Sequence, residues 1–181
     1  MTQTSPDDGF DHETYPDSYI HDILTSVKTV AMVGASPNPS RPSYFVLKYL
    51  LTKGYEVHPI NPGHAGKTLL GREVYGDLAD VPKPVDMVDI FRNSDAAGPI
   101  TDAAIAVGAK VVWMQLTVRN DAAARRAEAA GLKVVMNRCP KIEFGRLSGE
   151  IGWTGVNSRT ISAKRTKLQK GYQHFGLRPL K

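Results

Sequence analysis

The chain lacks several features that would place it in a special class of proteins. One cysteine, Cys139, stands among its 181 residues, which excludes an internal disulfide and suits a reducing compartment. No apolar run approaches the roughly 18 residues that a transmembrane helix needs. The first residues, with Asp7, Asp8 and Asp11, are acidic and polar, unlike a secretory or transit peptide. We therefore expect a cytoplasmic protein.

Outside the last 32 residues, the chain also has almost no excess of positive over negative charge. The net charge is +5, but residues 150–181 hold seven Lys/Arg and one acid, which leaves the first 149 residues near −1. An apolar content of 41% is typical of a globular chain. We expect an acidic segment at 1–16, one domain at 17–149 and a basic C-terminal extension at 150–181. That extension is expected to dock on the domain, with nucleic-acid binding as the alternative.

Strand and helix patterns alternate along the proposed domain. Helical spacing marks residues 17–27, 43–53, 94–107 and 121–130, and β-rich apolar runs mark 29–34, 56–60, 85–91, 110–116 and 132–137. Five apolar strands separated by helices predict an α/β fold, a Rossmann-like doubly wound parallel sheet with right-handed crossovers. The expected strand order is 3-2-1-4-5.

The turn after the first strand is the most informative segment. An apolar run ends in Gly34 and leads into a helix for which Ser43 is the expected N-cap. Backbone amides and the positive end of a helix suit a phosphate at such a turn. A dinucleotide fingerprint would need glycines where Ser36 and Pro39 stand, and the loop carries Arg41 instead. The turn therefore predicts a phosphorylated nucleotide other than NAD.

Parallel sheets bind ligands beyond the carboxyl ends of their strands, so the residues there are the candidate site. Three arginines and a lysine among them indicate a strongly anionic ligand. These candidates are Gly34, Ala35, Ser36, Arg41, Asn61, Pro62, Lys67, Phe91, Arg92, Met114, Gln115, Asn137, Arg138, Cys139 and Pro140.

The end of the second strand narrows the choice of nucleotide. An NAD site usually places Asp or Glu there to bind the ribose hydroxyls, whereas this chain has Asn61 followed by Pro62. The missing carboxylate also removes repulsion against a phosphorylated ribose. Coenzyme A, with a 3′-phosphate, and NADP, with a 2′-phosphate, both remain open at this point.

Six short motifs in order resemble one family. They are VGASPNPSRPS at 33–43, PINP at 59–62, LGREVY at 70–75, VDIFR at 88–92, VWMQ at 112–115 and NRCP at 137–140. Together they resemble the small stand-alone CoA-binding proteins, which are similar to the N-terminal CoA-binding domain of the succinyl-CoA synthetase α subunit. The resemblance covers about residues 19–149 and implies a Rossmann-like domain that holds CoA at the carboxyl edge of its sheet.

The same resemblance implies a role for each group of candidates. Gly34, Ala35, Ser36 and Arg41 would meet the pyrophosphate. The nucleotide pocket would be lined by Asn61, Pro62, Phe91 and Arg92. Gln115 and the turn 137–140 would close the far side.

No catalytic constellation stands out in the sequence. The synthetase needs a phosphorylated histidine from a second domain, and the five histidines of this chain match no such motif. None is spaced with Cys139 as zinc ligands are, and Cys139 itself is expected to be a small buried residue rather than a nucleophile. We expect a non-catalytic binder of CoA or acyl-CoA: a carrier, a sensor or a partner of an acyl-CoA enzyme. The alternatives are an NADP(H)-binding oxidoreductase or redox sensor, and a ligand-gated protein whose basic tail binds nucleic acid.

Overall fold

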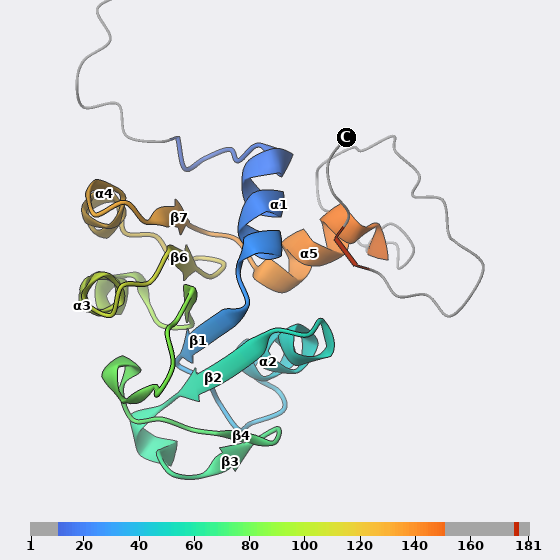
Figure 1. Ribbon diagram of the computed structural model, residues 1–181, viewed down its shortest axis with the longest axis vertical. Coiled ribbons are helices and arrows are strands. Elements are labelled where there is room, and N and C mark those ends of the chain that lie inside the picture. The colour runs from blue at the N-terminus through green and yellow to red at the C-terminus, as the bar shows by residue number, and fades with distance from the viewer. Residues whose placement is uncertain (1–10, 151–175, 178–181) are drawn as a thin grey trace, which may run out of the picture.

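A computed structural model describes residues 11–150 and 176–177 of the protein. Five parallel strands form one sheet in the order β2-β1-β5-β6-β7 (Figure 1). These strands are β1 (Thr29–Val33), β2 (Glu56–Ile60), β5 (Met87–Ile90), β6 (Val111–Met114) and β7 (Lys133–Val135). The predicted fold class and its five parallel strands are confirmed.

Five α-helices accompany the sheet: α1 (Asp17–Ser26), α2 (Pro42–Thr52), α3 (Ser94–Ala106), α4 (Asp121–Ala129) and α5 (Pro140–Ser148). The first four agree closely with the predicted ranges. The sequence analysis missed α5, which is separated from the end of β7 by four residues. It also missed two 3-10 turns, η1 (Pro62–His64) and η2 (Leu78–Asp80), and the small hairpin of β3 (Thr68–Leu69) and β4 (Arg72–Glu73).

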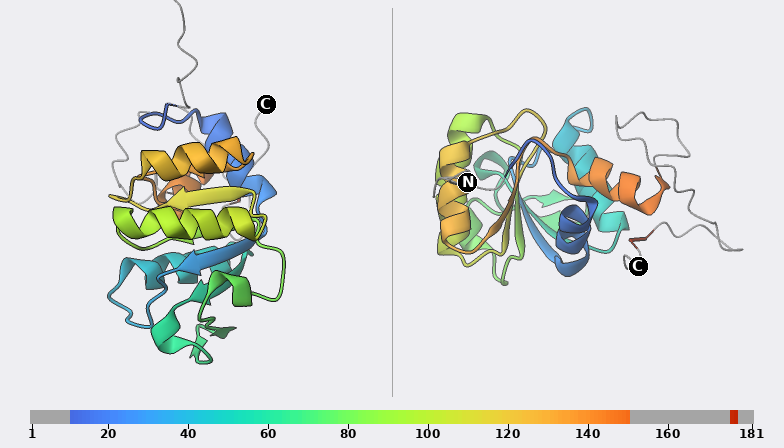
Figure 2. Two further views of the ribbon diagram at one scale, coloured as in Figure 1. Left: turned by 90° about the vertical axis from the view of Figure 1, so that its left-hand side faces the viewer. Right: turned by 90° about the horizontal axis from the view of Figure 1, so that it is seen from above.

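The helices cover both faces of the sheet, α1, α2 and α5 on one and α3 and α4 on the other (Figure 2). Side chains within a strand alternate between these layers, as the strand period requires. In β6, Val111 and Trp113 join the apolar cluster under α1, α2 and α5, whereas Val112 and Met114 join the cluster under α3 and α4. Both faces of the central strands are therefore buried, which explains their continuous apolar runs.

The position of one strand differs from the expected order. Counted along the chain, the five strands run 2-1-3-4-5, because β5 pairs with β1 and not with β2. The outer edge of β2 is occupied by the chain near Tyr75, which forms a bridge with Ile60. Asp86 ties β5 to β1, since its carboxylate accepts the backbone N–H groups of Lys28 and Thr29 at 2.9 and 3.1 Å. Successive strands are therefore added on one side of β1 up to β2 and on its other side from β5 onward, so the strand order reverses between β1 and β5.

Tyrosine hydroxyls cover the open edge of β7. The Tyr19 hydroxyl donates to the Val134 carbonyl at 3.2 Å and accepts the Val134 N–H at 3.1 Å. The Tyr15 hydroxyl accepts the Met136 N–H at 2.8 Å. An uncovered strand edge is a template for pairing with another chain, so these contacts protect the sheet. They also show that contacts with the domain begin before residue 17, the expected boundary.

Tyr19→Phe is expected to lower the free energy of unfolding by about 1–3 kcal/mol, because the buried N–H and C=O of Val134 lose their partner. Urea unfolding measures the loss, and light scattering would detect self-association through the uncovered edge. Tyr44→Phe is the control, since the Tyr44 hydroxyl forms no hydrogen bond within the part of the chain that the structure describes. Equal stability of Tyr19→Phe and wild type would contradict this role of the hydroxyl.

Two expectations concern residues that lie mostly outside the described part of the chain. The acidic segment is described only from residue 11, and the basic extension only at Glu150 and at 176–177. Of these, Leu177 packs against the apolar cluster under α1, α2 and α5. Among residues 11–150 and 176–177, no helix has the length and apolar character needed to cross a bilayer.

Candidate ligand site

The strand ends of β1 and β5 touch at the carboxyl edge, the edge at which all five parallel strands end. Gly34 follows β1 with a φ of +90°, and a Cβ added to it would collide with the Phe91 carbonyl oxygen that follows β5. The same Cβ would lie 3.0 Å from Cδ of Arg92. This contact lies where the strand order reverses, the usual ligand position in open α/β sheets. The structure thus brings Gly34, Phe91 and Arg92 together.

The turn after Gly34 is held by its own side-chain oxygens. Ser43 Oγ accepts the Ser36 N–H at 3.1 Å, and Ser36 Oγ accepts the Asn38 N–H at 3.2 Å. Asn38 Oδ1 in turn accepts the Ser40 N–H at 2.9 Å. Each of these amides is a donor that a phosphate oxygen could take in place of the side-chain oxygen. The turn is therefore ordered, with donors suited to an anion.

Ser43 is not the N-cap that the sequence predicts. The helix begins at Pro42, and Arg41 before it makes no side-chain capping bond. Ser43 lies within the first turn, where its hydroxyl reaches back to the loop rather than to the helix amides. Pro42 accounts for this start, because proline suits the first helical position and lacks an N–H to cap.

Asn61 links the turn after β1 to the turn after β2. Its Nδ2 donates to the Ala35 carbonyl at 2.7 Å, and its Oδ1 accepts the Gly63 N–H at 3.0 Å. Pro62 begins η1. Lys67 is exposed just before the β3–β4 hairpin. Asn61 is therefore already engaged in joining the two turns.

Residues after β7 serve mainly to hold the edge together. Asn137, with a φ of +53°, accepts the Thr117 N–H on its Oδ1 at 2.8 Å. Thr117 itself has a φ of +69°, which is unusual for a β-branched residue and is stabilised by this bond. Cys139 and Pro140 are buried at the start of α5, and burial raises the pKa of the Cys139 thiol. That pKa supports the buried interpretation of Cys139 over a reactive one.

Arg138 faces the N-terminal segment rather than the turn after β1. Its Nη2 donates to the Glu13 carbonyl at 3.2 Å, and its guanidinium lies 5.7 Å from the centre of the Tyr15 ring. Met114, another candidate, points into the core under α3 and α4. The structure therefore separates these two residues from the candidates near Gly34.

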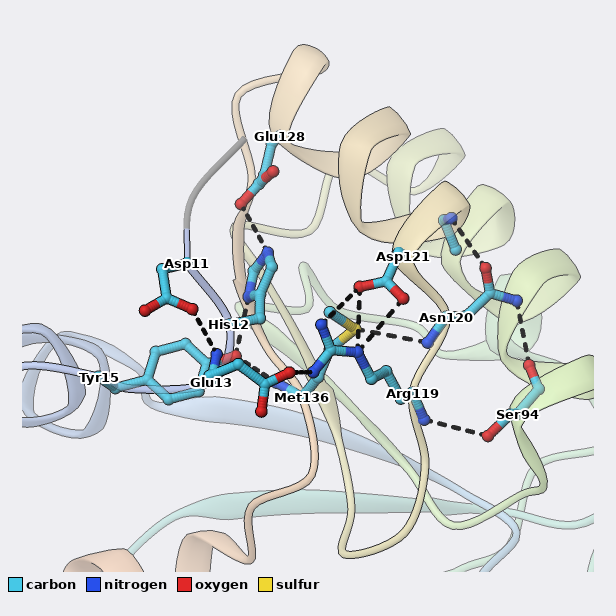
Figure 3. Close-up of polar contacts among 11 residues, drawn as sticks. Asp11, His12, Glu13, Tyr15, Ser94, Arg119, Asn120, Asp121, Glu128 and Met136 are labelled. Carbon is cyan, nitrogen blue, oxygen red and sulfur yellow. Dashed lines mark hydrogen bonds and ion pairs between the residues drawn. The ribbon is translucent and has the colours of Figure 1, made fainter. Parts of the chain in front are cut away.

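A neighbouring polar cluster joins the N-terminal segment to α4 (Figure 3). Arg119 pairs with Glu13 and with Asp121, while His12 Nε2 lies 3.1 Å from Glu128. Arg119 was not a candidate in the sequence, and its place after β6 became clear only from the fold. This cluster neutralises the guanidinium of Arg119 with two carboxylates.

The two arginines that follow β1 and β5 differ from Arg119 in their ion pairing. Arg41 and Arg92 are both exposed, and neither forms an ion pair with any of the residues that the structure describes. Arg119 and Arg138 are engaged by the N-terminal segment, whereas Arg41, in the ordered turn after β1, and Arg92, two residues after β5, have no carboxylate partner among the described residues.

Comparison with known proteins decides the family. Residues 28–145 match the CoA binding domain family, a range that contains every candidate residue. This chain belongs to that family.

Relatives of this CoA binding domain include both small proteins and one much larger subunit. YneT of Bacillus subtilis is 32% identical over 123 residues, which cover 68% of this chain and 90% of YneT. The structure of a hypothetical protein from Pyrococcus horikoshii is similar with a TM-score of 0.70 and 41% identity, covering 81% of this chain and 99% of that one. The α subunit of ADP-forming acetate–CoA ligase I from Pyrococcus furiosus is 30% identical over 95 residues, half of this chain but 21% of the subunit. The resemblance seen in the six motifs is confirmed.

The CoA binding domain also holds a buried carboxyl that the sequence analysis did not single out. Asp89 in β5 is fully buried and accepts a hydrogen bond from Gln115 Nε2 at 2.8 Å. Burial raises the pKa of Asp89 to about 7, although the bond from Gln115 opposes that change. An acidic residue inside an otherwise apolar strand was the signal in the sequence that could have revealed it.

Proposed function

We propose that this CoA binding domain binds coenzyme A, free or acylated, at the carboxyl edge of its sheet and performs no chemistry on it alone. It would act as a carrier, a sensor or a partner of an acyl-CoA enzyme. The exposed guanidiniums of Arg41 and Arg92 beside the ordered turn carry this proposal. CoA has a pyrophosphate and a 3′-phosphate, which need several positive and donor groups close together.

The residues near Gly34 suit this ligand class in three respects. Gly34 has no side chain, so the turn after β1 can lie against the Phe91 carbonyl and the ends of β1 and β5 stay close together. The amides of Ser36, Asn38 and Ser40 are held by side-chain oxygens that a phosphate can replace. Asn61 presents no carboxylate to repel a phosphorylated ribose. The name of the related acetate–CoA ligase subunit supports the same ligand class.

Calorimetry with CoA, 3′-dephospho-CoA, NADPH and NAD tests the proposal. We expect CoA to bind most tightly and the loss of its 3′-phosphate to weaken binding. A preference for NADPH would favour the alternative of an NADP(H) protein. Absence of CoA binding by the full chain would refute the proposed function.

Arg41→Ala is expected to weaken CoA binding by about 1–3 kcal/mol, the range for a hydrogen bond to a charged group. Isothermal titration of both proteins at the same ionic strength measures the difference. Arg125→Ala, which removes an exposed cation from α4, is the matched control and should leave the affinity unchanged. If the two variants bind CoA equally well, Arg41 does not contact the ligand.

A further inference from the structure

Asp89 lies on the face of the sheet that α1, α2 and α5 cover. Within β5, Met87 belongs to the cluster on that face and Val88 and Ile90 to the opposite one, so Asp89 alternates back to the side of Met87. Its neighbours in register are Met32 of β1 and Trp113 of β6, both fully buried. A carboxyl group in such surroundings costs folding free energy, which raises the question of what it does.

The hydrogen bonds of Asp89 are incomplete. Its Oδ1 accepts from Gln115 Nε2 at 2.8 Å, whereas its Oδ2 is buried and has no hydrogen-bond partner among the described residues. A carboxyl group kept only for stability would be expected to use both oxygens. The bond to Gln115 is therefore the contact through which we expect Asp89 to act.

That bond decides which way the Gln115 side chain points. An ionised carboxylate can only accept, so it holds the Nε2 end of the amide inward. The planar amide then presents Oε1 on its other side. Gln115 follows β6 at the carboxyl edge, where its backbone N–H donates to the carbonyl of Ile90, the last residue of β5, at 3.3 Å. Gln115 is a largely buried residue, and its Oε1 accepts no hydrogen bond from any residue that the structure describes, so this part of the edge holds an unused acceptor, in contrast to the donors of Arg41 and Arg92.

An acceptor suits a different part of CoA from the phosphates. The phosphate groups accept hydrogen bonds, whereas the pantetheine arm carries two amide N–H donors. We propose that Asp89 is a positioning residue that fixes the carbonyl of Gln115 toward the carboxyl edge, where it accepts a hydrogen bond from an amide N–H of the pantetheine arm. The inference rests on the proposed function and adds to it how the arm of the ligand is recognised.

Two ligands separate this role from a structural one. CoA contains the pantetheine arm, and adenosine 3′-phosphate 5′-diphosphate contains the same phosphorylated nucleotide without it. At pH 8 we expect Asp89→Leu and Gln115→Met each to bind CoA about tenfold more weakly than wild type, a change of about 1.4 kcal/mol. Both variants should bind the nucleotide without the arm as tightly as wild type does.

Asp89→Asn is the conservative control, because its Oδ1 can still accept from Gln115 Nε2. It should retain most of the affinity for CoA. Equal losses for both ligands in Asp89→Leu and Gln115→Met would show that Asp89 only maintains the fold, and unchanged affinity for CoA would also overturn the inference. Failure of the wild-type protein to bind either ligand would instead refute the proposed function.

Discussion

Gly34→Ala is expected to lower the free energy of unfolding by more than about 3 kcal/mol and to abolish ligand binding at the turn. The residue has a φ of +90°, which costs an L side chain about 1–2 kcal/mol. The added Cβ would also collide with the Phe91 carbonyl oxygen, a backbone atom that cannot rotate away as a side chain can. Relief requires the ends of β1 and β5 to separate, and the proposed site lies there.

Gly54→Ala separates the two causes. Gly54 has a φ of +88°, nearly that of Gly34, and a Cβ added to it would meet none of the described atoms within 4 Å. Its substitution should cost only about 1 kcal/mol, because a smaller unfolded-state entropy offsets part of the backbone strain. Urea unfolding of both variants measures the difference. Equal losses of stability would mean that the close contact with Phe91 does not matter.

Asp89→Asn is expected to stabilise the protein increasingly as the pH rises. Burial raises the pKa of Asp89 to about 7 from an ordinary value of 3.8. Between these values the folded protein binds a proton that the unfolded chain has released, so this group lowers the free energy of unfolding as the pH increases. Asparagine does not titrate and avoids that loss. The gain should approach the order of 4 kcal/mol at pH 8 and vanish below about pH 4.

Chemical unfolding of wild type and variant from pH 4 to pH 8 measures this gain. Other carboxyl groups also change stability over this range, but they do so equally in both proteins and cancel in the difference. Asp95→Asn, which alters an exposed carboxyl at the start of α3, is the control and should change the free energy of unfolding at pH 8 far less than Asp89→Asn does. A constant difference for Asp89→Asn would show that Asp89 is ionised throughout.

Local patterns in the sequence were sufficient for most of the secondary structure. Continuous β-branched runs predicted the buried strands, and Gly34 marked the turn after the first of them. The missed helix α5 begins at Pro140, with four residues between it and the end of β7, and the sequence analysis assigned Pro140 to the turn at the carboxyl edge instead. The hairpin of β3 and β4 has only two residues in each strand, too few for a period of two to be visible.

The sequence analysis predicted that all the candidate residues lie at the carboxyl edge of the sheet. The structure separates those near Gly34 from those that contact other parts of the domain. Arg41, Arg92 and Lys67 are exposed cations, as the anionic-ligand hypothesis requires. Arg138 is drawn to Glu13, which lies 125 residues earlier in the chain, and no local pattern could reveal that contact. Whether the remaining candidates bind CoA stays a prediction that the experiments above decide.

The sequence alone determined where the five strands of the sheet and the first four α-helices form, because the spacing of apolar residues and the positions of glycine and proline act over a few neighbouring residues. It also contained the six motifs that place the chain in its family. Only the tertiary structure decided that β5 lies beside β1, that Phe91 meets Gly34, and that Asp89 reaches Gln115 on the neighbouring strand. These depend on contacts between segments far apart in the chain, where the loss of chain entropy is recovered only once the whole sheet has formed.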